Sequence, residues 1–278
     1  MSFDPCGIIT LLTDFRTCDE YVGSMKGVIL NIFPAARIVD ISHEVPAQDI
    51  MGASFILENS YRYFPPGSIH CVVVDPGVGT ERKPISVRTA DYLFVGPDNG
   101  VFSRIFSLER DCEVREISNP DFKLEEISDT FHGRDIFATS SAHLAREGRF
   151  EDIGPVVASY VEVHPAQPTA WANTIKGEVI HIDSYGNIIT NISRRLFDEN
   201  VRDRPFVIEL NGRQVKRISR NYQAEEEGRF LALFGSSGML EVSVRGGSAQ
   251  RRIGAGKGDN VLVTILDGGR KPEREPLP

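Results

Sequence analysis

The chain has 278 residues, 41% of them hydrophobic, which is enough to bury a core and to divide into two domains. Its formal net charge is −8, whereas binding to nucleic-acid phosphates requires an excess of basic residues, so we expect no nucleic-acid partner. The four cysteines are scattered through the first half without a Cys-x-x-Cys pair, which argues against a disulfide scaffold and against a cysteine-rich zinc site.

The chain begins Met1-Ser-Phe-Asp-Pro, without the basic residues that precede the apolar run of a signal peptide. No apolar run in the sequence approaches the roughly 20 residues needed to cross a bilayer. We therefore expect a soluble, cytoplasmic protein with no membrane partner.

The first half of the chain alternates between strand and helix patterns. Buried apolar runs predict strands at residues 7–13, 37–41, 72–74, 85–88 and 92–95. Apolar residues at helical spacing predict helices after Asp19, which is the expected N-cap, from about Asp49 to Tyr61, after Gly100, and from Asp135 to Gly148. This alternation is typical of βαβ units. It predicts an α/β domain at residues 1–164, with a mostly parallel sheet flanked by helices.

A proline-marked stretch around Pro165 and Pro168 predicts a linker at residues 165–171. Beyond it we find only strand patterns, at residues 176–182, 206–210, 213–216, 230–234, 240–244 and 261–265. Asn211-Gly212 between two of these strands predicts a type I′ hairpin. Residues 172–278 are therefore expected to form a smaller all-β, barrel-like domain.

The most informative stretch is Val72-Val-Val-Asp75-Pro-Gly-Val-Gly79, in which a buried strand ends at an acid and a tight turn. Ligands of open α/β sheets bind beyond the carboxyl ends of the strands, so Asp75 lies where a site is expected. Arg82 is close enough in sequence to fold back over the same turn. The alternative interpretation is a plain strand end with a solvated aspartate.

His132 lies just before a predicted helix, where the helix dipole favours the neutral, proton-accepting imidazole. A single histidine is more often a capping or packing residue. Similarly, Asp183-Ser-Tyr-Gly-Asn187 is explained locally as an Asx-rich turn.

A divalent-metal site is one alternative use of these polar residues. Asp14, Asp40 and Asp75 end predicted strands, and together with His132, Asp135 and His43 they include possible metal ligands. However, no metal-binding spacing, phosphate-binding loop or serine-hydrolase elbow is present, so we predict neither a metal nor another cofactor.

Six ordered motifs together resemble a known family. They are Leu12-Thr-Asp14-Phe with Asp19-Glu-Tyr-Val-Gly-Ser-Met-Lys26-Gly, Val74-Asp-Pro-Gly-Val-Gly79, Gly96-Pro-Asp-Asn-Gly100, Phe131-His-Gly-Arg-Asp135, Asp183-Ser-Tyr-Gly-Asn187 and Ser236-Ser-Gly238. The resemblance is to the S-adenosyl-L-methionine (SAM) hydroxide adenosyltransferases, the SAM hydrolases related to the SAM-dependent fluorinase and chlorinase. It implies a homotrimer that binds SAM between the N domain of one subunit and the C domain of its neighbour.

The resemblance also implies a role for each matching residue. Asp75, Arg82 and His132 match the hydrolytic triad. Asp14 would hold the ribose diol, and Asp19 and Asp183 would contact the methionine amino group. Ser236 or Ser237 would bind the methionine carboxylate, Asn187 the adenine edge, and Tyr222 would stack on the base. The implied reaction is in-line attack of water or hydroxide at ribose C5′, which gives adenosine and L-methionine without a cofactor.

Three residues in two motifs differ from the pattern of the halogenating relatives. Asp75 stands where the fluorinase pattern has an aromatic hydroxyl, and His132-Gly133 stands where it has Tyr-Ser. A carboxylate repels a halide ion, and Gly133 has no side-chain donor for one, so the resemblance favours water as the nucleophile. A SAM-dependent halogenase, a metal-dependent hydrolase and a SAM- or adenosine-binding module are the alternatives.

Overall fold

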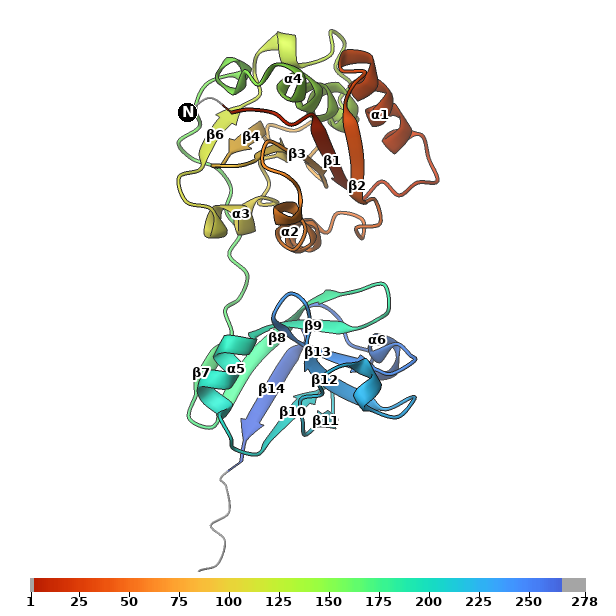
Figure 1. The fold of residues 1–278 in the computed structure, drawn as a ribbon, viewed down its shortest axis with the longest axis vertical. Helices are drawn as coiled ribbons and strands as arrows, with labels where there is room; N and C mark the ends of the chain where they lie inside the picture. The colour runs from red at the N-terminus through yellow and green to blue at the C-terminus, as the bar shows by residue number, and fades with distance from the viewer. Residues whose placement is uncertain (1–2, 267–278) are drawn as a thin grey trace, which may run out of the picture. The chain divides into compact units, whose positions relative to one another are not determined.

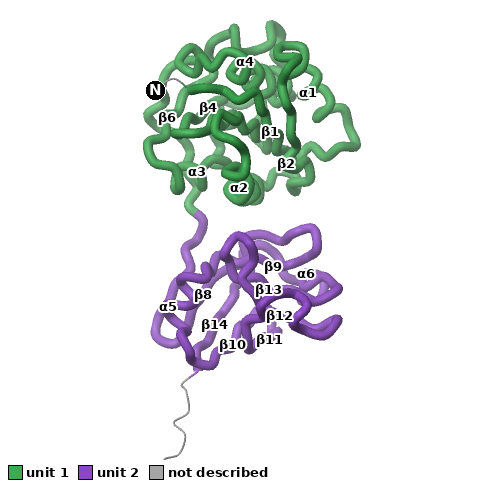
Figure 2. Tube along the Cα trace, viewed as in Figure 1, with its two compact units in different colours: residues 1–164 green, residues 165–278 purple. Residues whose placement is uncertain are grey.

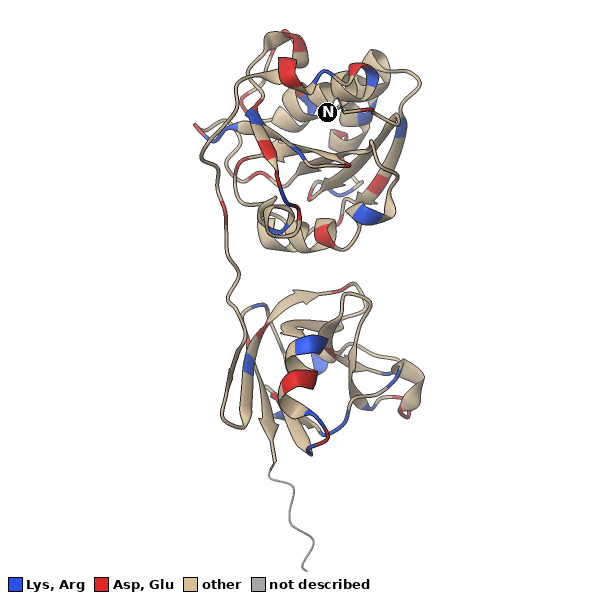
Figure 3. Cartoon of the chain, turned by 60° about the vertical axis from the view of Figure 1, so that its left-hand side comes forward, with Lys and Arg blue, Asp and Glu red and all other residues tan. Residues whose placement is uncertain are grey.

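The computed structural model describes residues 3–266. Contacts within the chain divide it into two compact units, residues 1–164 (unit 1) and residues 165–278 (unit 2), which Figure 2 shows in separate colours. Within residues 3–266, no helix is long and apolar enough to cross a membrane. Acidic and basic residues are interspersed over both units (Figure 3).

Unit 1 is built on a six-stranded sheet. Its strands are β1 (Ile8–Thr13), β2 (Arg37–Ser42), β3 (Ile69–Val73), β4 (Pro84–Arg88), β5 (Leu93–Pro97) and β6 (Glu113–Glu116), in the order β2-β1-β3-β5-β4-β6. The pairs β1–β2, β1–β3 and β3–β5 are parallel, whereas β4 pairs antiparallel with both β5 and β6. The predicted, mostly parallel sheet is thus confirmed.

Helices cover both faces of this sheet. They are α1 (Tyr21–Ile32), α2 (Ile50–Glu58), α3 (Ser103–Leu108) and α4 (Thr139–Glu147), with short 3₁₀ turns at Tyr61–Tyr63, Pro120–Phe122 and Phe150–Ile153. In Figure 1, α1 and α4 lie on one side of the sheet and α2 and α3 on the other. Alternate residues of β3 point into two hydrophobic cores. Cys71 and Val73 belong to the core under α1 and α4, and Val72 belongs to the core under α2 and α3. Burial on both faces explains the continuous apolar run of this strand.

Helix α1 begins later than predicted. Its N-cap is Glu20, not Asp19, and the Glu20 side chain makes no capping hydrogen bond. At α2, by contrast, the Asp49 carboxylate accepts a hydrogen bond of 3.0 Å from the backbone N–H of Gly52. Gly148 ends α4 in the left-handed conformation, with φ of 67°, as expected of a glycine at this position.

Unit 2 is an antiparallel, nearly closed barrel, which confirms the predicted all-β class. Its strands are β7 (Thr169–Trp171), β8 (Thr174–Ile182), β9 (Ile188–Ser193), β10 (Phe206–Leu210), β11 (Arg213–Val215), β12 (Phe230–Phe234), β13 (Met239–Val244) and β14 (Asn260–Ile265). Seven of them follow the order β11-β10-β14-β8-β9-β13-β12, and the end strands β11 and β12 contact each other. Asn211 and Gly212 have φ of 46° and 76°, the positive values that the predicted type I′ hairpin requires.

The expectation that only strands follow the linker is wrong. Unit 2 contains α5 (Arg194–Val201), α6 (Ala249–Ile253) and a 3₁₀ turn at Tyr222–Ala224. Both helices are too short for periodicity to reveal, but their caps are ordinary: Ser193 and Ser248 each accept a hydrogen bond from a first-turn N–H. In addition, β7 lies inside the stretch expected to be a linker and pairs with β8.

Candidate active site

A buried ion pair lies beyond the carboxyl end of β3. Asp75 follows the strand by two residues, and the chain then turns so that Arg82 folds back onto it. Arg82 Nε donates to both carboxylate oxygens of Asp75, at 2.9 Å and 3.0 Å. The side chains of Asp75 and Arg82 are only 5% and 9% exposed. Such a pair is costly to desolvate and is stable only where its geometry is good. The bonds from Nε to both carboxylate oxygens meet that condition.

The same guanidinium holds His132. Arg82 Nη2 lies 2.7 Å from His132 Nδ1, and because a guanidinium can only donate, Nδ1 must be the acceptor. Burial lowers the pKa of His132, and the positive charge of Arg82 lowers it further. The imidazole is therefore neutral at neutral pH and carries its proton on Nε2, which is left to donate to a bound molecule.

A π-helical segment, Gly133–Ala138, leads from His132 into α4. The widened turn is a recurring feature of functional sites. Gly133 packs so tightly that an added Cβ would lie 3.2 Å from the ring of Phe15, whose ring also meets that of Phe131 edge-on at 5.9 Å. Phe15, two residues after the end of β1, is thus packed directly against the residues on either side of His132.

One donor of the site has no partner within residues 3–266. Arg82 Nη1 is buried and makes no hydrogen bond there, while the guanidinium lies 5.2 Å from the centre of the Phe137 ring. An unsatisfied buried donor on the guanidinium that also holds His132 is suited to a polar or anionic ligand atom.

Asp14 lies at the same sheet edge as Asp75. Thr13 pairs with Val73 in the parallel register of β1 and β3, so the two following segments leave the sheet side by side. Asp14 Oδ2 accepts a hydrogen bond of 2.8 Å from the backbone N–H of Gln48, whereas Oδ1 accepts none within the described chain. Asp19 lies just before α1, and its carboxylate accepts a hydrogen bond of 3.5 Å from the Cys18 thiol.

Three of the four acids that could serve as metal ligands, Asp40, Asp75 and Asp135, form ion pairs with basic side chains. Asp40 Oδ2 lies 2.6 Å from Lys26 Nζ, and Asp135 Oδ1 lies 2.6 Å from Arg134 Nε. Among residues 3–266, no group of three or more histidine, cysteine, aspartate or glutamate side chains is arranged to hold a metal ion.

Unit 2 contains a cavity of about 780 Å³ that brings together Asp183, Asn187 and Tyr222. Asp183 Oδ1 accepts the backbone N–H groups of Tyr185 and Asn187 at 2.9 Å, and Oδ2 accepts Asn187 Nδ2 at 2.8 Å. The Asx-rich turn is therefore real, and it also fixes the Asn187 side chain at the cavity wall. Tyr222 donates its hydroxyl to Glu241 Oε1 at 2.8 Å, which orients its ring.

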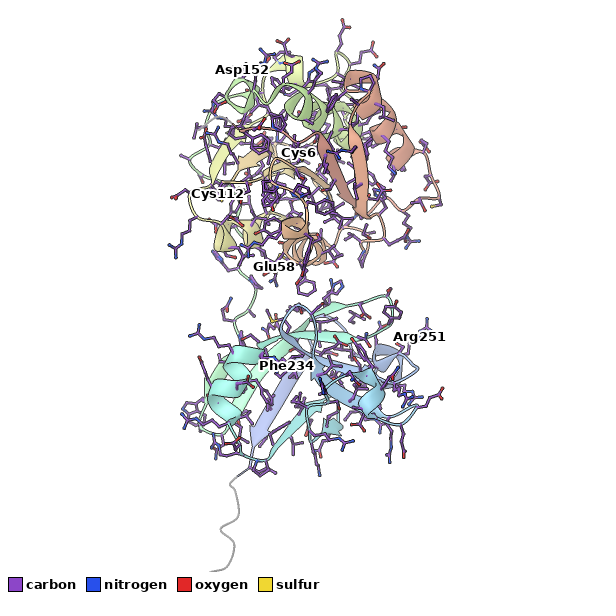
Figure 4. The ribbon with its side chains drawn as sticks, in the orientation of Figure 1. Cys6, Glu58, Cys112, Asp152, Phe234 and Arg251 are labelled. Carbon is purple, nitrogen blue, oxygen red and sulfur yellow. The ribbon has the colours of Figure 1, made fainter. Side chains whose placement is uncertain are left out.

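The two predicted serines are not part of this cavity. Ser236 and Ser237 lie in the turn between β12 and β13 and do not line it. The cavity wall also contains residues that the sequence did not single out, among them Arg245, Ser248 and Arg251. Figure 4 labels Arg251 on α6. Gly246-Gly247-Ser248, a turn followed by a helix cap, was the available signal for this part of the wall.

Comparison with known proteins places this geometry in a family. Residues 9–154 match the SAM hydroxide adenosyltransferase N-terminal domain, and residues 177–262 match the corresponding C-terminal domain. The chain therefore belongs to the SAM hydroxide adenosyltransferase family, as its motifs indicated.

Individual relatives are similar over most of their length. An (R)-S-adenosyl-L-methionine hydrolase from Thermus thermophilus is 35% identical over 90% of this chain and 96% of its own. A crystal structure of an uncharacterized conserved protein from Thermotoga maritima superimposes with a TM-score of 0.87 at 35% identity, covering 92% of this chain and 99% of that one. A fluorinase from an Actinoplanes species is 27% identical over 67% of this chain and 72% of its own.

Proposed function

We propose that this protein hydrolyses SAM to adenosine and L-methionine by attack of water at ribose C5′. The observation that carries the proposal is the buried Asp75–Arg82–His132 cluster, in which one guanidinium contacts both other members. The full-length similarity to a protein named as an (R)-SAM hydrolase supports the same substrate. Pure binding of SAM would not require such a cluster.

In the proposed reaction the C5′–O bond forms while the C5′–S⁺ bond breaks, and methionine leaves as a neutral thioether. His132 donates through Nε2–H to the water oxygen and orients it. Among the described residues, Asp75 Oδ1 accepts a single hydrogen bond, from Arg82 Nε, and keeps a lone pair for the water proton. Arg82 Nη1 stabilises the developing hydroxide.

A water-poor site favours this reaction because opposite charges cancel on the way to the transition state. The incoming hydroxide is anionic and the sulfonium is cationic, and both are better solvated in water than the neutral products are. The near-complete burial of Asp75 and Arg82 fits that requirement. Positioning the water in line behind C5′ supplies further acceleration.

Substrate contacts are proposed for the residues that match the family motifs. Asp14 would hold the ribose diol, for which its unpaired Oδ1 is available. Asp19 and Asp183 would contact the methionine amino group. Asn187 would meet the adenine edge and Tyr222 the base, and both line the cavity of unit 2. Ser236 or Ser237 would bind the methionine carboxylate.

We further propose that the protein is a homotrimer in which neighbouring subunits share each substrate, that it needs no metal, and that it acts in the cytoplasm. Cys6, Cys18, Cys71 and Cys112, which are all described, are free thiols, in keeping with a reducing compartment. Full activity in the presence of a chelator would support metal independence, whereas loss of activity that added metal restores would favour the metal-dependent hydrolase.

The halogenase is the second candidate because a fluorinase is among the relatives. In this chain the buried Asp75 carboxylate would lie next to the nucleophile and would repel a halide ion. Gly133 offers no side-chain donor to bind one. Incubation with chloride or fluoride is expected to yield adenosine and no 5′-halogenated product.

The test of the proposed function is turnover of the two SAM epimers at sulfur, supplied separately with a chelator present. Chromatography should detect equimolar adenosine and methionine, and the name of the Thermus thermophilus relative leads us to expect the (R) epimer to react faster. Stoichiometric binding of SAM without any adenosine would overturn the hydrolase and leave the binding module.

A further inference from the structure

A second polar chain lies behind the candidate active site and plays no part in the proposed reaction. It runs from Asp40 on β2 through His43 to Thr13 at the end of β1. His43 Nδ1 lies 2.8 Å from Thr13 Oγ1, and His43 Nε2 lies 3.1 Å from Asp40 Oδ1, without the alignment of a good hydrogen bond. Lys26 closes the chain with its contact of 2.6 Å to the other oxygen of Asp40.

The order Asp–His–Thr is that of a hydrolytic triad, but this hydroxyl cannot attack a substrate. Thr13 is completely buried, and His43 is only 4% exposed. The Thr13 oxygen already accepts the backbone N–H of Phe15 at 3.2 Å. The Asp40–His43–Thr13 series is therefore structural, and its function depends on which segment it positions.

Thr13 and His43 hold the segment that contains Asp14. Besides the Phe15 contact, the backbone N–H of Arg16 donates to the carbonyl oxygen of His43 at 2.8 Å. A few residues further along, the N–H of Gln48 donates to Asp14 itself at 2.8 Å. Residues 14–16 are thus tied to residues 43–48 by both backbone and side-chain hydrogen bonds.

Two residues in these segments have a backbone conformation that side chains disfavour. Arg16 and Gln48 have φ of 59° and 65°, in the left-handed region that non-glycine residues rarely adopt. Such conformations persist where surrounding contacts determine them, and they cluster at ligand sites. Arg16 is held by its own N–H bond to the His43 carbonyl oxygen and, through its neighbour, by the Phe15 N–H bond to Thr13 Oγ1.

The hydrogen atoms can be assigned along the chain. Because the Phe15 N–H donates to Thr13 Oγ1, the Thr13 hydroxyl hydrogen is free to donate to His43 Nδ1. In this arrangement Nδ1 is the acceptor and Nε2 carries the hydrogen, 3.1 Å from Asp40 Oδ1 but not aligned for a hydrogen bond. Burial alone would raise the pKa of Asp40, but its contacts with Lys26 and His43 outweigh burial and lower it. The carboxylate is thus ionised and fixes the ring orientation.

We propose that His43 is a positioning residue: through Thr13 and its own carbonyl group it holds Asp14 in the orientation that grips the ribose diol. This inference rests on the proposed function, because the ribose contact does. Asp14 grips the diol equally in the bound substrate and in the transition state. Misplacing Asp14 therefore raises KM and changes kcat little.

The same sheet contains a natural control. Thr10, also on β1, lies 2.8 Å from Nδ1 of the buried His70, so the two threonine–histidine pairs have the same geometry. His70 packs among the rings of Tyr61 and Phe94, and in the described part of the chain it makes no hydrogen bond or ring contact with residues 14–16. Losing the Thr10 hydroxyl should therefore affect stability without affecting the substrate.

The experiment compares Thr13→Val with Thr10→Val, since valine keeps the shape and removes only the hydroxyl. Both variants should melt at a similarly lowered temperature, because each leaves a buried histidine nitrogen without its hydrogen-bond partner. Thr13→Val should raise KM for SAM about tenfold, the equivalent of one lost buried hydrogen bond, while Thr10→Val leaves KM unchanged. Equal KM values in the two variants would overturn the proposal.

A second measurement tests whether the effect passes through Asp14. His43→Gln should raise KM about tenfold in the wild-type background, but less than about twofold when Asp14→Ala is already present, because the two changes then remove the same contact. Additive effects would contradict positioning through Asp14. If the wild-type protein does not hydrolyse SAM, the proposed function fails by itself. Calorimetry with adenosine then reads the ribose contact in the same variants.

Discussion

Arg82 is the residue on which the proposed chemistry most depends. Its Nε bonds the Asp75 carboxylate and its Nη2 bonds His132, so one side chain sets the position of the other two. It also determines which nitrogen of His132 carries the proton. A lysine ammonium is a single point charge and cannot reproduce this planar fork.

We expect Arg82→Lys to lower kcat by at least about 100-fold, the size of effect seen when one preorganised donor is removed. The matched control is Arg104→Lys. Arg104 also pairs with a carboxylate, that of Glu58, and also lies over a ring, 5.5 Å from the centre of Phe55. A steady-state assay should show near wild-type kcat in the control, and similar losses in both variants would contradict a specific role for Arg82.

The neutral state of His132 predicts a pH dependence of activity. Its pKa is lowered from the ordinary value of 6.5 by burial and by Arg82, so the ring becomes protonated only at a pH below that value. Protonation places a second positive charge beside Arg82 and breaks the hydrogen bond to Nδ1. We therefore expect kcat/KM to be constant at and just above pH 7 and to fall as the pH drops below 6.5. An acid limb centred above pH 6.5 would contradict this assignment.

At the level of elements, β3 leads into the candidate site at its carboxyl end and also contains His70, whose burial makes the stability of the fold depend on pH. His70 is fully buried, and burial lowers its pKa from 6.5 to about 3. The unfolded chain binds a proton near pH 6.5 and the folded chain does not. The stability contributed by neutral His70 is therefore complete above pH 6.5 and is lost as pH falls toward 3.

His70→Phe should remove this part of the pH dependence. Between pH 7 and pH 5 the wild-type protein should lose roughly 2 kcal/mol of unfolding free energy through His70, and the variant should not. Urea unfolding at the two pH values measures the difference. His164 is exposed, so His164→Gln serves as the control and should keep the wild-type slope. Identical slopes in wild type and His70→Phe would disprove the assignment.

Much of this fold could be predicted because its long elements have strong patterns. The apolar run of β3, buried on both faces, and the Asn211-Gly212 turn indicated their structures directly. The Asp75 turn also indicated that Arg82 folds back. What sequence patterns could not give was the hydrogen-bond direction between Arg82 and His132, since that depends on residues 50 positions apart.

The missed elements share a physical cause. Helices α5 and α6 have 8 and 5 residues, and so few turns show little periodicity. Their serine caps were present but looked like ordinary loop residues between strands. Asp19 was expected to cap α1 because aspartate is a good N-cap, yet Glu20 is the N-cap and the helix begins one residue later than predicted, at Tyr21.

At the scale of the whole molecule, the candidate residues fall into two sets. The Asp75–Arg82–His132 cluster and Asp14 belong to unit 1, and the cavity with Asp183, Asn187 and Tyr222 belongs to unit 2. If neighbouring subunits of a homotrimer share each substrate, a defect in one unit can be complemented by an intact unit from another chain.

We therefore expect an inactive Asp75→Asn variant and an inactive Asn187→Ala variant to regain partial activity when coexpressed, because mixed trimers contain some sites in which both residues are intact. Light scattering should give the mass of three chains for each. Two copies of the same variant, coexpressed in the same way, are the control. A fully active monomer, or trimers that never complement, would refute the shared site.

The most direct test of the central claim is hydrolysis of SAM in ¹⁸O-labelled water, with chelator present and products identified by mass spectrometry. We predict that one heavy oxygen enters adenosine, at the 5′ hydroxyl, and none enters methionine. Asp75→Asn should abolish this product while still binding SAM. Unlabelled adenosine, or label found only in the methionine fragment, would show that water does not attack C5′ and would contradict the account.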